Sequence, residues 1–222
     1  MRAELRSERP DRLVAVVGTG TAVGKTWVGA KVCETLVARG LSVAARKLAQ
    51  SFIPGDDEAR VTDAHVLARA TGEAPESVCP PHRWYEVAMA PPMAAQALGR
   101  PPFTVAELVA ELQWPGGCRV GLLETAGGLL SPQAEDGEAT AVLDRVRADL
   151  VIVVADSALG VVHAVRSVVG RLGPTAPVVV LNCFDPTADL HRRSRDWLIG
   201  RDGLSVVTLP GGEEELADRV LD

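Results

Sequence analysis

The chain has 222 residues, 47% of them hydrophobic, which is enough to bury the core of one sizeable α/β domain or two small ones. Its formal net charge of −6 argues against nucleic acid or an anionic membrane as a partner, and no apolar run approaches the roughly 18 residues of a membrane span. Four scattered cysteines without a Cys-x-x-Cys pair argue against a disulfide framework or a zinc site. We therefore expect a cytoplasmic protein.

The first predicted elements form a βαβ unit. Residues 1–12 are rich in Arg and Glu and lack the apolar stretch of a secretory signal, so we expect a flexible N-terminal tail and then one domain over residues 13–222. That domain opens with a buried strand at 13–17, a helix at 25–38 and a second strand at 42–46. Two strands joined by a helix in this way should cross over right-handed.

Between residues 49 and 102 the pattern loosens and eight prolines accumulate. Short helices are expected at 62–70 and 93–98, with the acidic run Asp56-Asp57-Glu58 just before the first. An irregular insertion after the second strand often carries a binding site, although a proline-rich surface excursion would have the same composition.

Strands and helices then alternate to the end of the chain. A helix at 104–113 begins with Thr104 and Glu107, the residues of a capping box. The remaining strands are expected at 119–123, 150–155, 177–181 and 204–209, and the remaining helices at 138–146, 161–172, 187–199 and 213–221. This alternation predicts a mostly parallel sheet with helices on both faces, the three-layer α/β arrangement of a P-loop NTPase-like fold.

The stretch between the first strand and the first helix reads Gly-Thr-Gly-Thr-Ala-Val-Gly-Lys-Thr, from Gly18 to Thr26. A glycine-rich turn of this kind lets backbone N–H groups surround a polyphosphate at the positive end of the following helix. Lys25 would reach the β and γ phosphates, and the Thr26 hydroxyl would bind Mg²⁺. The stretch departs from G-x-x-x-x-G-K-[ST] because Gly18 comes one residue early, and a glycine-rich turn with a chance Gly-Lys-Thr is the alternative.

Polar residues follow the other predicted strands, and ligands of open parallel sheets bind at the carboxyl ends of their strands. Lys47 follows the second strand, Glu124 the third and Asn182 the fifth, and Asp63 lies in the insertion. Glu124 is placed to hold Mg²⁺ directly or through water. The alternatives are a surface lysine at 47, solvated charges at 63 and 124, and a turn-capping asparagine at 182.

Taken in order, these motifs resemble those of the ATP-dependent dethiobiotin synthetases. The loop resembles their G-T-x-T-x-V-G-K-T, Lys47 to Phe52 resembles K-P-V-x-[ST]-G, and the five residues from Glu124 resemble E-G-A-G-G. The helix opening at Gly160 resembles their G-[TC]-x-N-H, and Asn182 and Pro210 match residues that follow the last two strands. The resemblance extends from residue 13 to about residue 212.

The resemblance implies a homodimeric enzyme that uses ATP and Mg²⁺ to close a cyclic urea from 7,8-diaminopelargonate and CO2 or bicarbonate. Lys25 and Lys47 would stabilise the charge on the phosphorylated carbamate, and Thr26, Asp63 and Glu124 would hold Mg²⁺. The expected substrate contacts are Thr21, Ser51, Gly127 and Gly160. The expected nucleotide contacts are Gly20, Thr21, Ala22, Val23, Gly24, Lys25, Thr26, Trp27, Asn182, Cys183, Pro210, Gly211 and Gly212.

Four positions depart from the family pattern. Leu48 replaces a Pro, Phe52 and Thr125 each replace a Gly, and the helix opening at Gly160 carries Val162 and no asparagine for the substrate's tail carboxylate. Phe52 is expected to fill space near the substrate. The substrate half of the site is thus less well supported than the nucleotide half, and a nucleotide-binding paralogue with another substrate is an alternative.

A regulatory nucleotide switch is the alternative from another class. Gly-Lys-Thr, Glu124 to Gly127 and Asn182 to Asp185 faintly resemble the GTPase series G-K-[ST], D-x-x-G and N-K-x-D, but Glu replaces the Asp and Cys183 replaces the Lys. A partition-type ATPase fits less well, because its signature lysine would fall at Gly20.

Overall fold

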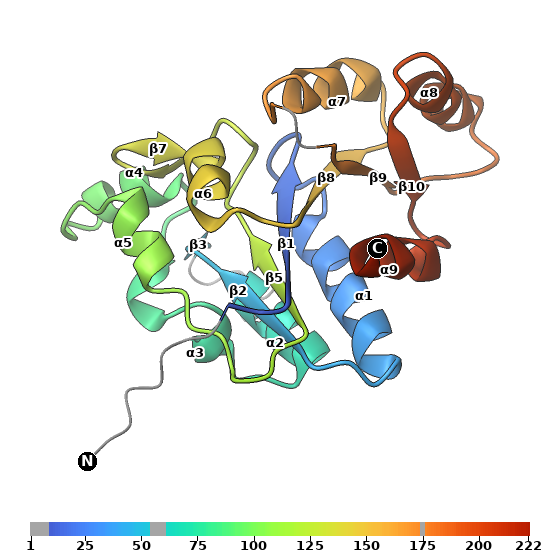
Figure 1. The fold of residues 1–222 in the computed structure, drawn as a ribbon. Coiled ribbons are helices and arrows are strands. Elements are labelled where there is room, and N and C mark those ends of the chain that lie inside the picture. Colours follow the sequence, from blue (N-terminus) through green and yellow to red (C-terminus); the bar gives the residue numbers. More distant parts are fainter. Residues whose placement is uncertain (1–8, 54–60, 174–175) are drawn as a thin grey trace.

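The structure, a computed structural model, describes residues 9–53, 61–173 and 176–222 (Figure 1). Most of the predicted tail and the acidic run Asp56-Asp57-Glu58 lie outside these residues. At the start of the described chain, Arg9 forms an ion pair with Asp149 at 2.9 Å, and the first strand begins at Arg12. The predicted division at residue 13 stays a prediction.

A six-stranded parallel sheet forms the centre of the fold, with the strand order β10-β9-β8-β1-β5-β2. The predicted parallel sheet is therefore confirmed. The neighbours of β1 are β5 and β8, which come much later in the chain, so the strand order reverses beside β1. The strands are β1 (Arg12–Gly18), β2 (Val43–Lys47), β5 (Val120–Glu124), β8 (Leu150–Asp156), β9 (Val178–Asn182) and β10 (Ser205–Thr208).

Helices cover both faces of the sheet. Successive strand residues point to opposite faces, and both sets are apolar, so each face needs a covering layer. Val14 and Val16 of β1 pack in the same core as α1, α2 and α9, whereas Val17 packs in the core of α7 and α8. The three-layer prediction is confirmed. The helices are α1 (Lys25–Ala38), α2 (Asp63–Thr71), α3 (Pro75–Val78), α4 (Pro91–Ala97), α5 (Val105–Ala110), α6 (Ala139–Val146), α7 (Val161–Val169), α8 (Asp189–Gly200) and α9 (Glu213–Leu221).

The described part of the insertion after β2 has more regular structure than its proline content predicts. It contains a two-stranded parallel pair, β3 (Gln50–Ser51) with β4 (Trp84–Tyr85), and the short 3-10 helix η2 (Pro81–Arg83). Leu48 and Tyr85 are buried with α4 and α5 in a third apolar cluster. A small hairpin, β6 (Pro132–Ala134) with β7 (Gly137–Glu138), follows the end of β5 and was not predicted.

The helix predicted at 104–113 is shorter than expected. Thr104 and Glu107 form the predicted capping box, but α5 ends at Ala110. The residues after it have other partners, since the carbonyl of Gln113 accepts a hydrogen bond from Arg46 Nε at 2.5 Å and the Arg46 guanidinium lies over the Trp114 ring. No helix in the described part of the chain is long and apolar enough to cross a membrane.

Candidate active site

The loop between β1 and α1 has backbone conformations that suit an anion-binding turn. Ala22 and Gly24 both have positive φ, +60° and +93°, and Gly24 is the N-cap of α1. The backbone N–H of Thr19 donates to the Val154 carbonyl at 2.9 Å, which ties the loop to β8. The N–H groups at the start of α1 therefore face a fixed, glycine-lined turn, as in a phosphate site at a helix N-terminus.

Three charged side chains meet at the carboxyl ends of β2 and β5. Lys47 Nζ lies 2.7 Å from Asp63 Oδ2 and 2.5 Å from Glu124 Oε1. Thr26 donates from its hydroxyl to Glu124 Oε1 at 2.9 Å. Lys47 and Glu124 are buried, with 4% and 0% of their surface exposed, whereas the Asp63 side chain is 42% exposed, so the cluster runs from the interior to the open side of the site.

The charges of this cluster support one another. Burial opposes the charge of Lys47, but the carboxylates of Asp63 and Glu124 outweigh it and raise its pKa above the usual range. The Lys47 charge in turn lowers the pKa of Asp63, despite burial. Burial raises the pKa of Glu124, with the Lys47 charge acting against it. A cation at Lys47 therefore helps to keep two carboxylates together in a site of low polarity.

Lys25 lies beside the same cluster without an ion pair in the described structure. Its Nζ donates to the Gly20 carbonyl at 3.1 Å, within its own loop. Burial, followed by the nearby charge of Lys47, lowers the pKa of Lys25, although Glu124 and Asp63 act the other way. An incoming anion would reverse that effect, because an opposite charge nearby favours the ammonium form.

The loop and the cluster line one cavity of about 520 Å³, here called the phosphate cavity. Its size lies within the range of small-molecule sites. A second cavity of about 310 Å³, the neighbouring cavity, shares four wall residues with it: Thr21, Ser51, Ala126 and Gly127. The rest of the neighbouring cavity is formed by residues 88–91 and Ser131. Two ligands bound in these cavities would meet at the shared wall.

The phosphate cavity has donors suited to Mg²⁺. Thr26, Asp63 and Glu124 supply oxygen atoms only, which Mg²⁺ prefers. Glu124 Oε2 is buried and has no hydrogen-bond partner among the described residues, so it has a free position for a cation or water. Within the described ranges no group of three or more His, Cys, Asp and Glu side chains could hold a metal. Two carboxylates and a hydroxyl fit a hydrated ion shared with a phosphate, as is usual for Mg²⁺.

Comparison with known proteins identifies the family. A family model described as an AAA domain matches residues 12–182. The ATP-dependent dethiobiotin synthetase of Parafrankia sp. is 34% identical over 197 residues, covering 82% of this chain and 76% of that protein. The enzyme of the same name from Mycobacterium tuberculosis (strain H37Ra) is 31% identical over 218 residues, covering 92% and 89%. The chain belongs to the ATP-dependent dethiobiotin synthetase family.

A further dethiobiotin synthetase, from Haloferax mediterranei, is 33% identical over 202 residues, with 88% of this chain and 82% of the relative covered. Among solved structures, chloroplast FtsY from Physcomitrella patens has a TM-score of 0.52 at 18% identity and covers 100% of this chain and 68% of that one. The latter likeness supports the P-loop α/β fold alone. The resemblance predicted from the motifs is thus confirmed at the level of the family.

The structure brings together many of the residues that the dethiobiotin synthetase motifs indicated. The phosphate cavity is lined by residues predicted for nucleotide, metal and substrate: Thr21, Ala22, Gly24, Lys25, Thr26, Trp27, Lys47, Ser51, Asp63, Glu124 and Gly127. They come from the loop after β1, from α1, β2, β3, α2 and β5, and from the turn after β5. Asp63 is the first residue of α2, whereas Asp57, the other candidate metal ligand, lies outside the described residues.

Other predicted contacts lie outside the lining of the phosphate cavity. Gly20 lines a different cavity, beside α7, and Gly160 is the N-cap of α7. Asn182 donates from Nδ2 to the Val23 carbonyl at 3.0 Å, which places it behind the loop. Cys183, Pro210, Gly211 and Gly212 follow β9 and β10. Their predicted contacts with the nucleobase stay predictions.

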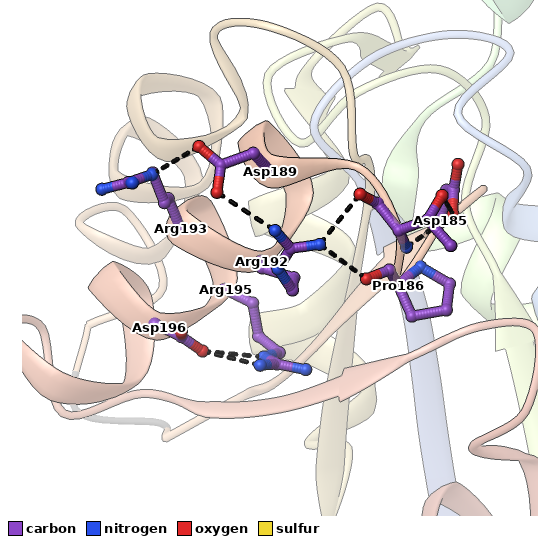
Figure 2. A network of polar contacts seen from close by, with 8 residues as sticks. Asp185, Pro186, Asp189, Arg192, Arg193, Arg195 and Asp196 are labelled. Atoms are coloured by element: carbon purple, nitrogen blue, oxygen red, sulfur yellow. Dashed lines mark hydrogen bonds and ion pairs between the residues drawn. The ribbon is translucent and has the colours of Figure 1, made fainter.

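The segment after β9, which would lie beside a nucleobase, is held by α8 (Figure 2). Arg192 donates from Nη1 to the carbonyls of Pro186 and Thr187, at 2.9 and 2.8 Å. Asp189 fixes that arginine at 3.1 Å and also pairs with Arg193 at 2.6 Å. These contacts are exposed, so they orient the segment rather than contribute much to stability.

The four departures from the family pattern do not line either cavity in the described structure. Leu48 is buried in the third apolar cluster, and Thr125 is buried with its backbone N–H on the Val16 carbonyl at 3.2 Å. Phe52 continues the β3–β4 pairing through its N–H and the Tyr85 carbonyl, at 3.0 Å. Val162 packs against the core beneath α7.

Two buried glutamines were not assigned a role from the sequence. Gln50, in β3, accepts a hydrogen bond from the Ala64 N–H at the start of α2, at 2.9 Å. Gln133, in β6, accepts from the N–H of Ala126 and donates to its carbonyl, at 2.9 and 2.8 Å. Gln50 occupies the variable position of the Lys47 motif, which carries little signal, and only the unpredicted hairpin brings Gln133 to the site.

Proposed function

We propose that the chain is an ATP- and Mg²⁺-dependent ligase that makes dethiobiotin from 7,8-diaminopelargonate and CO2, as a step of biotin biosynthesis. The observation that carries this proposal is the meeting of Lys47, Asp63 and Glu124 beneath a phosphate-type loop, in a chain of the dethiobiotin synthetase family. The same arrangement supports ATP as the phosphoryl donor, since Thr26 and Lys25 line the same cavity.

The reaction has three bond changes. One amine of the substrate attacks CO2 and loses a proton, which gives a carbamate. A carbamate oxygen then attacks the γ-phosphorus, the bond from that phosphorus to the bridging oxygen breaks, and ADP leaves. The second amine attacks the carbamoyl carbon and loses a proton, and phosphate leaves as the cyclic urea closes.

The residues of the phosphate cavity suit the second change, in which negative charge gathers between the two reacting groups. Lys25 and Lys47 both line this cavity and would stabilise that charge more as the phosphoryl group moves. Thr26, Asp63 and Glu124 would hold Mg²⁺, which when bound supplies positive charge to the phosphate oxygens. Because Lys47 contacts both carboxylates in the described structure, it would move toward the phosphate as the ion binds.

The neighbouring cavity is the proposed site of the diamine. Thr21, Ser51 and Gly127 lie in the wall that the two cavities share, which agrees with their expected contacts to the carbamate or the amines. A substrate held there would present its carbamate to a γ-phosphate held by the loop, and such positioning is a main source of rate in phosphoryl transfer.

We also propose the homodimer that the family resemblance implies. Its support is the apolar surface on the side of the loop, where Leu159, next to the start of α7, is 88% exposed and Leu130, which lines the cavity between the loop and α7, is 51% exposed. A partner covering this side would let α7, with Gly160 at its N-cap, approach the other subunit's substrate. Light scattering of the purified protein would test this, and a monomer at assay concentration would contradict it. The cytoplasmic location stays a prediction.

One assay tests the activity. The protein is incubated with ATP, Mg²⁺, bicarbonate and 7,8-diaminopelargonate, and phosphate release is measured with and without the diamine. We expect release that depends on the diamine and a product with the mass of dethiobiotin. Phosphate release that is the same without the diamine, or absent in both, would contradict the proposed reaction.

A paralogue with another substrate, or a nucleotide switch, would give a different result. The departures from the family pattern at Phe52 and Val162 are the observation that favours a different substrate. Such a paralogue would bind ATP but leave the diamine unreacted. A switch of the GTPase kind would bind GTP more tightly than ATP, so a titration with both nucleotides separates it from the ligase.

A further inference from the structure

The Gln50 side chain is almost fully buried, with 3% of the residue exposed, yet only one end of its amide has a partner in the described structure. Oε1 accepts the hydrogen bond from the Ala64 N–H at 2.9 Å. Nε2 is buried without a hydrogen-bond partner. Buried polar groups are nearly always paired, so an exception in the lining of a ligand-sized cavity points to a partner that arrives with the ligand.

The orientation of the amide is fixed by its neighbour. A backbone N–H can only donate, so the atom 2.9 Å from Ala64 N must be the oxygen of the amide. The amide nitrogen therefore cannot exchange places with the oxygen without losing this bond. Gln50 thus carries a buried donor with a defined direction.

Gln50 also caps the N-terminus of helix α2. Thr62 is the N-cap of α2, but its hydroxyl contacts His65 Nδ1 at 2.8 Å and does not cap the helix. Gln50 satisfies the N–H of Ala64 instead, from a different element. The first residue of α2 is Asp63, which pairs with Lys47. The Gln50 oxygen therefore positions Asp63 in the cluster.

The surroundings of Gln50 favour an anionic partner. Gln50 lines the phosphate cavity together with two cations, Lys25 and Lys47, and with the carboxylates of Asp63 and Glu124. In the proposed function those carboxylates would hold Mg²⁺, which leaves the cations and the Gln50 amide to face the anion. Ser51, the next residue, lies in the wall shared with the neighbouring cavity. An amide N–H₂ at this place adds a neutral donor to a group of charged ones, and hydrogen bonds to charged acceptors are the strong ones.

We propose that Gln50 donates a hydrogen bond from Nε2 to an anionic oxygen of the reacting group, either the γ-phosphoryl of ATP or the carbamate, while its Oε1 holds the start of α2. The inference rests on the proposed ligase function and adds a substrate-contacting residue to it. Gln50 then links the placement of Asp63 to the presence of the anion, because one rigid amide serves both.

The substitution Gln50→Glu separates the two roles. A carboxylate of the same size still accepts from the Ala64 N–H but cannot donate to an anion. Gln50→Met removes both functions, and Gln96→Glu makes the same chemical change at an exposed position of α4. We expect both variants to melt below the wild type, Gln50→Glu because it buries a carboxyl group near Asp63 and Glu124, and Gln50→Met because α2 loses its cap. Gln96→Glu should behave as the wild type throughout.

Nucleotide binding and turnover identify the acceptor. Losing a hydrogen bond to a charged oxygen costs a factor of about 10 to 100. If the acceptor is the γ-phosphoryl, Gln50→Glu weakens ATP binding by that factor. It leaves the affinity for ADP within about threefold of the wild type, which corresponds to a free-energy change of about RT. If it is the carbamate, both nucleotides bind normally and diamine-dependent kcat/KM falls by that factor. Equal losses for ATP and ADP would indicate only a diffuse charge effect and would overturn the proposal, as would unchanged turnover and ATP affinity.

A structure of the wild-type protein with a non-hydrolysable ATP analogue, bicarbonate and the diamine keeps the proposal testable if the variants do not fold. We expect Nε2 within hydrogen-bond distance of a ligand oxygen, and a fixed water or a protein acceptor there would overturn it. The proposed ligase function is tested separately: it fails if the wild-type protein shows no phosphate release that depends on the diamine. In that case the ATP and ADP affinities of Gln50→Glu still decide whether Gln50 contacts a γ-phosphoryl.

Discussion

Asn182, at the end of β9, donates from Nδ2 to the carbonyl oxygen of Val23 in the phosphate loop, at 3.0 Å. The contact leaves no room beside it, because a Cβ added to Gly24 would lie 2.1 Å from Asn182 Nδ2. Gly24 also has a φ of +93°, which disfavours residues with a side chain. The loop therefore depends on a glycine at this position both for its backbone conformation and for its packing against β9.

Gly24→Ala should disrupt the loop through these two effects together. We expect ATP affinity to fall at least about tenfold, because a left-handed residue with a Cβ costs about 1–2 kcal/mol before the clash with Asn182 is counted. Gly40→Ala is the matched control, since Gly40 has a φ of +80° but nothing within 4 Å of an added Cβ. That control should lose about 1 kcal/mol of stability and bind ATP normally. Equal ATP affinities for the two variants would contradict the role of the Asn182 contact.

Lys47 lies between the two carboxylates of the phosphate cavity, and we expect it to stabilise the transferring phosphoryl group. Lys47→Met should lower kcat at least about 100-fold, the usual cost of losing one preorganised donor, and leave ADP binding largely intact. Lys31→Met, on the exposed side of α1 where Lys31 pairs with Glu34, is the control for loss of a lysine. Kinetics with calorimetric binding of ADP would measure both. Turnover near that of the wild type in Lys47→Met would refute the role.

The fold could be predicted from the sequence because its strands are short apolar runs with polar ends. The residues 150–155 are all apolar, and the predicted helix over Lys25–Ala38 has the observed bounds. The β3–β4 pair and the β6–β7 hairpin were missed because strands of two or three residues give no period to detect. The end of α5 was misplaced for a tertiary reason, the contacts of Arg46 with Gln113 and Trp114.

The candidate site was predictable only in part, for the same kind of reason. Lys47 and Glu124 are the last residues of β2 and β5. These strands pair with Lys47 opposite Glu124, so the strand ends alone bring the two residues together. Asp63 reaches them from α2, a helix of the insertion, and its partner could not be deduced from spacing. The second layer of contacts, from Gln50 and Gln133, depends on chain paths through the insertion and the hairpin.

Gln133 holds the backbone that follows Glu124. It exchanges two hydrogen bonds with Ala126 and donates a third to the Ser131 carbonyl at 3.0 Å. Gln133→Met should leave these backbone groups without their partner, at about 1–3 kcal/mol for each one that stays buried. Because Ala126 and Gly127 form the wall shared by the two cavities, we expect the KM of the diamine to rise more than the affinity for ADP falls.

Hydrogen exchange supplies a second measure for Gln133→Met. The amide of Ala126 should exchange faster in the variant, whereas amides of the distant helix α9 should exchange as in the wild type. Gln96→Met, at an exposed position of α4, is the matched control and should leave both the diamine KM and the exchange at Ala126 unchanged. A variant with an unchanged diamine KM and unchanged exchange at Ala126 would show that the loop holds its shape without Gln133.

Cys79 links stability to alkaline pH. Burial raises the pKa of its thiol from 9.0 to about 12, so between these values the folded protein holds a proton that the unfolded chain has released. Stability from this group is therefore complete below about pH 9 and is lost as pH rises toward 12, at up to about 1.4 kcal/mol per pH unit. Cys79→Ala should lose stability less steeply over this range, by urea unfolding at pH 8 to 11. Cys183→Ala, at an exposed position, should follow the wild-type slope. Parallel curves for the wild type and Cys79→Ala would mean that the thiol does not titrate differently in the folded protein.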